Sequence, residues 1–423
     1  MKRTTGIPYG EGEKSFQVDE ENILCNLMPE LPPRPSMILE SQRIRDALQN
    51  PIGTEAIGSH VGKGDTAALL VDDWTRTTPA YKVVPIILQE LLDSGVKPEN
   101  IRIIVARGTH SPLDGQQMEK KLGRNTVDKY QVNNHNPLRD LTYLGESQKG
   151  TPVFINKSFM QADFKVAVGG ILAHPIAGYG GGAKIIVPGV AGAETINQNH
   201  SLADNPNVGV GMVEGNPVRE DMEDIARMAS LDFIVNVILN PQNEIIDAVA
   251  GDVVKAHREG IIRYNQIYGI KVGEAADIVV LGAHPRDATI YHGTFALPCA
   301  VPLIKEGGPI IWVAPCLTGP GTRLEREEFR KILSIQPSRL MMSIRNGEIP
   351  ASGGVFDWCT SKVVHRNNVI LVSDLVSQRE AEEFGFSNAE SIQKALDEEL
   401  IRNRNAKVAI IPVGGLAVPI QQS

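Results

Sequence analysis

Short apolar runs alternate with helical patterns through most of the 423-residue chain, and this alternation limits the fold more than any other feature. The run AALLVDD, which ends at Asp73, is typical of a buried strand, and residues 81–92 carry apolar side chains on one helical face. Gly95 ends that helix, and IRIIVARGTH (101–110) is the next predicted strand. A strand, a helix and a strand in this order predict a parallel sheet. The expected fold class is therefore α/β, with mainly parallel sheets flanked by helices.

A second series of strands and helices begins near Gly273, and 423 residues are too many for one compact core. We therefore predict two α/β domains, residues 1–270 and 271–423, with the active site in the cleft between them. The start of the chain is expected to be rich in β-structure, because SFQVDEENILCNLMP (15–29) alternates in polarity. The clearest later helix is expected over residues 388–404, with Asn388 as its N-cap.

The composition excludes several classes of protein. The net charge of −8 and the 5% of aromatic residues argue against nucleic acid or a membrane surface as a partner. No apolar run is long enough to span a bilayer, and none follows the basic N-terminus as in a secretory leader. The four cysteines have no CxxC spacing and are expected to be free thiols. These features predict a cytoplasmic protein.

Polar side chains follow three of the predicted strands. In open α/β sheets ligands bind beyond the carboxyl ends of strands, so one crevice is expected to collect these side chains. Arg76 could hold a substrate carboxylate through two hydrogen bonds, and Asp73 could orient a histidine. The alternative is a charged turn that caps the following helix. The residues that follow the strands are Asp72, Asp73, Thr75 and Arg76, then Arg107, Thr109 and His110, then His174.

Residues 169–192, GGILAHPIAGYGGGAKIIVPGVAG, form the most informative segment of the chain. Gly180, Gly181 and Gly182 are expected to offer backbone N–H groups to a phosphate, and Lys184 follows directly. The GxxxxGK[ST] spacing of a P-loop is absent. Beside apolar residues, Lys184 could lose its hydration and act as a nucleophile or a covalent anchor. The alternative is a glycine-rich hinge with a solvated lysine.

Three of the nine histidines lie in or next to predicted loops around this segment: His110, His174 and His200. A single histidine is more often a structural residue than a ligand, but three around one glycine-rich segment favour a shared site. They could bind one zinc ion together and activate water, as in a hydrolase. Alternatively, one of them binds a metal while the other two transfer protons.

The sequence resembles the nickel-dependent lactate racemase family, which includes racemases and epimerases of other hydroxy acids. The resemblance covers most of the chain. It rests on DDWTRTTP (72–79), ARGTH (106–110), GGILAHPIAGYGGGAKIIVPG (169–189) and the asparagine-flanked His200. It implies two α/β domains with the site between them. It also implies an isomerase that inverts the carbinol carbon of a 2-hydroxy acid by reversible hydride transfer.

The resemblance implies a nickel-pincer nucleotide, a pyridinium mononucleotide with two sulfur-containing arms, joined to Lys184 through a thioamide. His200 matches the protein ligand of the nickel, and His110 and His174 match two acid–base residues on opposite faces of the substrate. The partners implied are a hydroxy acid and the proteins that build the cofactor; association with further copies of the chain is left open. The other residues expected to contact cofactor or substrate are Asp73, Thr75, Gly180, Gly181, Gly182 and Trp358, and Arg76, Tyr291, His292 and Phe295.

One departure from the family pattern concerns the substrate. In the stretch DATIYHGTFALP (287–298), His292 stands where lactate-acting members have glutamine, and Phe295 where they have a substrate-facing lysine. The loss of a cation should weaken binding of a small carboxylate, so a hydroxy acid other than lactate is predicted. A sugar acid is one such substrate, and its additional hydroxyl groups could form hydrogen bonds with Asp72, His292 and Thr294. A zinc hydrolase and a non-enzymatic protein that binds an acidic ligand are the alternatives.

Overall fold

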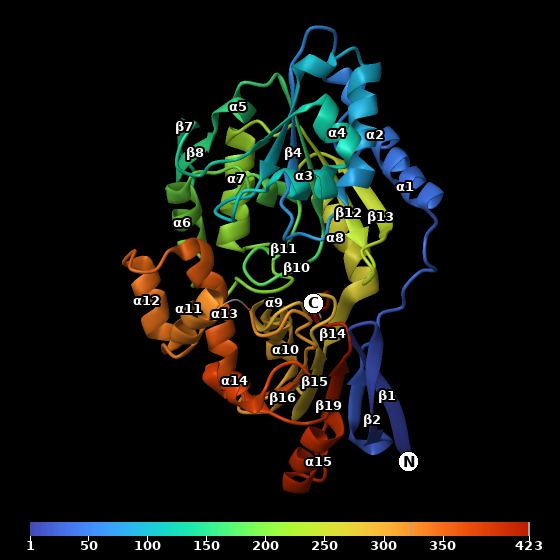
Figure 1. Ribbon diagram of the computed structural model, residues 1–423, viewed down its shortest axis with the longest axis vertical. Coiled ribbons are helices and arrows are strands. Elements are labelled where there is room, and N and C mark those ends of the chain that lie inside the picture. Colours follow the sequence, from blue (N-terminus) through green and yellow to red (C-terminus); the bar gives the residue numbers. More distant parts are fainter. Residues whose placement is uncertain (322, 422–423) are drawn as a thin grey trace.

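The computed structural model describes residues 1–321 and 323–421, which build two six-stranded sheets flanked by helices (Figure 1). In the first sheet only β13 is antiparallel to its neighbour, and in the second sheet all strands are parallel. The predicted fold class is thus confirmed. The first sheet has the order β13 (Ile245–Gly251), β12 (Phe233–Leu239), β9 (Phe164–Gly170), β4 (Ala67–Asp72), β5 (Ile101–Ala106) and β6 (Gln131–Asn134). The second has the order β18 (Ser387–Asn388), β17 (Val369–Val372), β16 (Ile310–Val313), β15 (Ile278–Gly282), β19 (Val408–Ile411) and β3 (Ile23–Asn26).

Both faces of the first sheet are covered, which explains why its central strands read as continuous apolar runs. Leu69 and Val71 of β4 point to the face covered by α1 (Met37–Gln49) and α2 (Ala80–Asp93). Ala68 and Leu70 point to the opposite face, where α6 (Ala193–Ser201) and α7 (Pro217–Met228) pack. The other helices before residue 270 are α3 (Gly115–Leu122), α4 (Arg124–Lys129), α5 (Lys157–Met160) and α8 (Lys255–Tyr268).

The second sheet is also covered on both faces. Val280 of β15 packs with the apolar side of the hairpin β1 (Lys2–Tyr9) and β2 (Gly12–Asp19) and with α15 (Ile392–Arg402). Leu281 faces the other core, which holds the fully buried Trp312. The remaining helices here are α9 (Ile290–Gly293), α10 (Leu297–Ala300), α11 (Arg323–Leu333), α12 (Pro337–Arg345), α13 (Ala351–Arg366) and α14 (Gln378–Glu383). The short strand pairs are β7 (Leu141–Glu146) with β8 (Pro152–Asn156), β10 (Ala173–His174) with β11 (Gly178–Tyr179), and β14 (Gly269–Val272) with β20 (Val418–Gln421).

Besides the β1–β2 hairpin, other segments cross the predicted domain boundary. Strand β3 joins the second sheet through β19, and residues of α12 and α13 join the core of the first sheet. The division into residues 1–270 and 271–423 stays a prediction, and the sequence pattern did not anticipate these links. Within the described ranges, no helix is long and apolar enough to cross a membrane.

The predicted N-cap Asn388 is wrong. Asn388 lies in β18, and α15 begins after Ser391, whose side chain accepts a hydrogen bond from the backbone N–H of Lys394. Both residues are good N-caps, so the difference comes from tertiary structure, because β18 pairs with β17 and draws Asn388 into the sheet.

The buried His135 should make the fold sensitive to acid. Its Nε2 contacts the carbonyl of Ala191 at 2.9 Å, and its Nδ1 contacts the Asn156 amide at 3.1 Å. Burial lowers the pKa of His135 to about 4, and the charge of Arg107 adds to this. The unfolded chain binds a proton below its own pKa of about 6.5 while the folded protein does not, so stability is lost as pH falls from 6.5 towards 4.

The His135→Gln variant should therefore lose less stability than the wild type between pH 7 and pH 5, by about 2 kcal/mol. Denaturant unfolding at the two pH values measures the difference. An equal loss in both proteins would show that His135 does not contribute to acid sensitivity.

Candidate active site

A cavity lies beyond the carboxyl ends of β4, β5 and β9 and is closed on its other side by residues that follow β15. It collects most of the side chains singled out in the sequence. Parallel strands bring these ends together at one edge of the sheet, as the sequence analysis predicted. From the first half of the chain the lining includes Asp72, Asp73, Arg76, Arg107, Thr109, His110, His174, Gly180, Gly181, Lys184 and His200. From the second half it includes Arg286, Tyr291, Phe295, Ser352 and Phe356.

Asp73 and His110 form a carboxylate–imidazole pair at the ends of β4 and β5. The Nδ1 of His110 lies 2.9 Å from Oδ2 of the buried Asp73. Burial alone would raise the pKa of Asp73, but the hydrogen bond and charge of His110, together with Arg76, hold that pKa well below its usual range. The backbone N–H and hydroxyl of Thr75 donate to the other oxygen, Oδ1, at 2.8 and 2.5 Å. With its proton on Nδ1, His110 has Nε2 available as a base.

The Asp73→Asn variant should keep its fold and lose catalytic rate. An amide can present its NH2 group to Nδ1 of His110, which favours the tautomer with its proton on Nε2 and so removes the base. We expect kcat to fall by about 10- to 100-fold, a typical cost of losing a partner that orients a functional histidine. The Thr75→Val variant is the control, because it removes one hydrogen bond to Asp73 and leaves the carboxylate in place. Equal kcat values for D73N and wild type would contradict this role.

His174 is held in the opposite manner. It ends the short strand β10, and its Nδ1 accepts hydrogen bonds from the backbone N–H groups of Ile176 and Ala177, both at 3.2 Å. A neutral ring with an accepting Nδ1 carries its proton on Nε2. Burial lowers the pKa of His174 well below the usual value, and the nearby Lys184 and Arg76 add to this. His174 therefore offers an N–H donor at Nε2, whereas His110 offers a lone pair.

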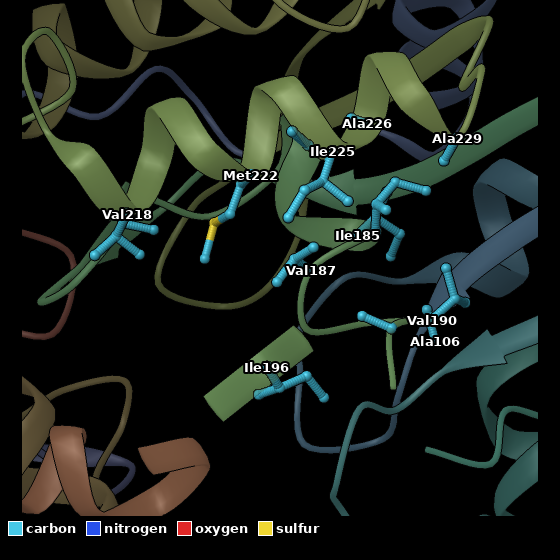
Figure 2. Packing of buried hydrophobic residues seen from close by; sticks show 14 of the residues in the cluster. Ala106, Ile185, Val187, Val190, Ile196, Val218, Met222, Ile225, Ala226 and Ala229 are labelled. Carbon is cyan, nitrogen blue, oxygen red and sulfur yellow. The ribbon is translucent and has the colours of Figure 1, made fainter. Parts of the chain in front are cut away.

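Lys184 lies on a 3₁₀ turn, Gly182–Ile185, that is fixed by the apolar residues after it. Ile185 and Val187 pack with Met222 and Ile225 of α7 (Figure 2). The Lys184 side chain is half-buried and lines the cavity. Burial lowers its pKa well below the usual value, and the cations Arg76, Arg219 and Arg286 act in the same direction. This environment favours the neutral amine, which is the nucleophilic form of a lysine.

The glycine-rich loop does not present the predicted row of free N–H groups. The N–H of Gly180 donates to the carbonyl of Leu172, and that of Gly182 donates to Oδ1 of Asn236, both at 2.8 Å. The loop carbonyls turn inward, where the fully buried Arg219 donates to Ala177, Tyr179 and Gly181. The N–H groups of Gly180 and Gly182 are therefore not free for a phosphate, contrary to the prediction, and of these three glycines Gly180 and Gly181 line the cavity.

His200 is buried on α6 and lines the cavity. Its Nδ1 lies 3.2 Å from Oδ1 of Asn199, which leaves Nε2 as the atom that can bind a metal. Burial and the charge of Lys184 lower the pKa of His200 to about 3, so the imidazole is neutral at physiological pH. In the described part of the chain, no three His, Cys, Asp or Glu side chains are grouped so as to hold a metal ion. The predicted three-histidine zinc centre is thus not formed.

Two predicted contact residues lie away from the cavity. Trp358 is a core residue of α13, and the ammonium of Lys362 lies 3.6 Å from the centre of its ring. The aromatic residue of α13 that lines the cavity is Phe356, two positions earlier. His292 is absent from the cavity lining, and its Nδ1 lies 2.8 Å from the Thr289 hydroxyl. The structure therefore places neither Trp358 nor His292 in the cavity lining, and Trp358 has the core position that was its alternative.

The groups expected to bind extra substrate hydroxyls are also occupied. Asp72 pairs with the ammonium of Lys121 at 2.6 Å and accepts from the Thr78 hydroxyl. The hydroxyl of the fully buried Thr294 donates to the Tyr291 carbonyl. Thr75 does not line the cavity either and acts on it through Asp73. These contacts remove the support for a sugar acid that the sequence had offered.

Sequence reasoning missed several residues that shape the site. Arg219, Asn236 and His257 hold the glycine-rich loop from behind; Nε2 of His257 lies 2.8 Å from the Gly180 carbonyl. They come from α7, β12 and α8, and no local signal relates them to the loop. Arg286, which lines the cavity, was also missed. Its position after β15, in the polar loop at a carboxyl strand end, was the available signal.

Two family models match the chain over most of its length. The lactate racemase N-terminal domain matches residues 9–211, and the lactate racemase C-terminal domain matches residues 272–420. Lactate racemases of Thermoanaerobacterium thermosaccharolyticum and Lactiplantibacillus plantarum are each 29% identical over an alignment of 422 residues, which covers 96% of this chain and 97% of each relative.

Solved structures give the same result. The lactate racemase apoprotein from T. thermosaccharolyticum superimposes with a TM-score of 0.87 and 28% identity, and each chain is covered completely. A Thermotoga maritima protein shares the fold, with a TM-score of 0.68 and 18% identity. With the two family models, these matches show that the chain belongs to the lactate racemase family.

Proposed function

We propose that this protein is a racemase or epimerase that inverts the carbinol carbon of a 2-hydroxy acid other than lactate. The observation that carries the proposal is the opposite hydrogen bonding of two histidines in one cavity. Asp73 fixes the proton of His110 on Nδ1, and the backbone at Ile176 and Ala177 fixes that of His174 on Nε2. One ring can take the proton of a hydroxyl group while the other donates a hydrogen bond to the substrate.

Inversion needs proton transfer at both faces of the substrate. When a hydroxyl loses its proton and its carbon loses hydride, a planar keto acid remains, and return of hydride to either face gives either configuration. Nε2 of His110 takes the hydroxyl proton on one face. His174 serves the other face. For the mirror reaction its proton moves from Nε2 to Nδ1, which breaks the hydrogen bonds from Ile176 and Ala177 and leaves Nε2 as the base.

The residues present fit the nickel-pincer nucleotide that the family resemblance implies. Lys184 supplies a desolvated amine for the covalent thioamide, and His200 supplies a neutral imidazole with Nε2 available to nickel. One protein ligand is enough, because the sulfurs and the ring carbon of the cofactor would supply the others. When bound, the cofactor would supply a reversible acceptor for hydride. Lys184 and His200 would hold it, and Asp73 and Arg76 line the same cavity.

Two other functions remain as alternatives and predict different results. A zinc hydrolase is disfavoured because His110, His174 and His200 do not form a metal-binding group. A protein that only binds an acidic ligand would explain the cations of the cavity. It would not require the opposite tautomers of His110 and His174, and its binding would survive replacement of both.

The test is to make the protein with and without the cofactor-building proteins, and to measure intact mass and the inversion of a panel of single-enantiomer 2-hydroxy acids. We expect an added mass of several hundred daltons on Lys184 only in the first preparation, and inversion only by that preparation. Lactate should be inverted more slowly than the best acid of the panel. A loaded protein that inverts no acid of the panel would contradict the proposal.

A further inference from the structure

Arg286 brings a cation to the cavity that no described acidic residue neutralises. It lies in the loop between β15 and α9, and its guanidinium faces the cavity. Among the residues that the structure describes, no carboxylate lies within 4.0 Å of Arg286. The charged group with the largest effect on its pKa is Arg76, which is another cation. Burial lowers the pKa of Arg286 to about 10, and Arg76 adds to this. The guanidinium nevertheless stays charged at physiological pH.

The acids of the cavity are already used. In the described ranges, Asp72 and Asp73 are the acidic residues that line it. Asp72 pairs with Lys121 and Asp73 pairs with His110. Arg107, a third guanidinium at the cavity, donates to the carbonyls of His135 and His110 and is thereby held in place. Arg76 and Arg286 therefore keep free hydrogen-bond donors for a ligand.

An aromatic surface fixes the position of Arg286. Its guanidinium lies 5.0 Å from the centre of the Phe295 ring, and Phe295 stacks on Phe356 with ring centres 4.0 Å apart. A cation on an aromatic face keeps its N–H edge available for a planar anion. Phe295 itself carries no charge, so Arg286 supplies the positive charge beside it.

We propose that Arg286 binds the carboxylate of the hydroxy acid substrate in this cavity, and so determines specificity for acids over uncharged analogues. This inference rests on the proposed function. Arg286 lines the same cavity as Arg76, and the two cations lie close enough for the charge of Arg76 to lower the pKa of Arg286. Two neighbouring guanidinium groups with free donors suit a planar carboxylate.

Two measurements test the role of Arg286. In the loaded enzyme, Arg286→Met should raise KM for the preferred acid by about 10- to 100-fold, with a smaller effect on kcat and an unchanged mass on Lys184. Arg286→Lys should restore part of the affinity. In protein made without cofactor, calorimetric titration with oxalate should show the same order of affinity: wild type, then R286K, then R286M. The matched control is Arg402→Met, which removes an exposed arginine of α15 that pairs with Glu399.

The possible failures are distinguishable. If R286M lost the mass on Lys184, Arg286 would serve the cofactor and the inference would be wrong. Equal oxalate affinity in wild type and R286M, or no binding of oxalate by the wild type, would also overturn it. If no acid of the panel were inverted, the proposed function would fail, while the oxalate titration would still decide whether Arg286 binds a carboxylate.

Discussion

Replacement of His110 or His174 by glutamine should lower the rate of inversion by about 10²- to 10⁴-fold, the usual contribution of a positioned acid or base. Each ring serves one face of the substrate, so loss of either one stops inversion in both directions. Glutamine keeps a polar side chain of similar length but cannot carry a proton at physiological pH. The two enantiomers should nevertheless respond differently, because each single variant retains the histidine for one of them.

Single-turnover formation of the keto acid from each pure enantiomer, measured by chromatography after an acid quench, reports this difference. We expect each variant to convert one enantiomer to the bound keto acid faster than the other, with the preference reversed between H110Q and H174Q. Unchanged melting temperature and unchanged mass on Lys184 are the controls. If a variant inverted both enantiomers at the wild-type rate, the replaced histidine would have no role in the reaction. Equal effects on keto acid formation from both enantiomers would contradict the assignment of one ring to each face.

Lys184→Arg should abolish covalent attachment of the cofactor and lower activity by at least about 10⁴-fold. A tether replaces a binding equilibrium by a fixed, oriented group, and such orientation is worth several orders of magnitude. Arginine has a side chain of similar length but cannot form the thioamide, since its guanidinium stays protonated. It also loses the desolvated amine that burial and Arg219 produce at this position. Intact mass and the inversion rate of the preferred acid are the measurements.

The matched control is Lys149→Arg, which alters an exposed lysine that pairs with Glu220. K149R should carry the full mass and keep wild-type activity. If K184R still carried the cofactor mass, the anchor would be another residue, and the assignment of Lys184 would be wrong.

The sequence predicted the arrangement of strands well because local patterns determine it. Strands β4, β5 and β9 are apolar runs that end in polar residues, and parallel pairing alone then brings Asp73, His110 and His174 to one edge. Lys184 was found because it follows three glycines and precedes an apolar run. These features are local, so they can be recognised in a single sequence.

The remainder depends on contacts between distant segments. Gly180 and Gly182 were expected to bind phosphate. The backbone of their loop is instead hydrogen-bonded to Arg219 and Asn236, which come from later elements of the chain. Trp358 and Phe356 lie on the same helix, and only the packing of α13 decides which of them meets the cavity. Likewise, Arg286 stands out because no acid among the described residues pairs with it, which sequence order cannot reveal.

Inversion of the preferred 2-hydroxy acid in D2O tests the central claim most directly. If the carbinol hydrogen leaves and returns as hydride while the histidines move only the hydroxyl proton, the inverted product should keep protium on its carbon. Mass spectrometry of the product measures this retention. Deuterium on the carbon of every inverted molecule would instead show that a histidine removes a carbon-bound proton, and the account given for His110, His174 and Lys184 would be wrong.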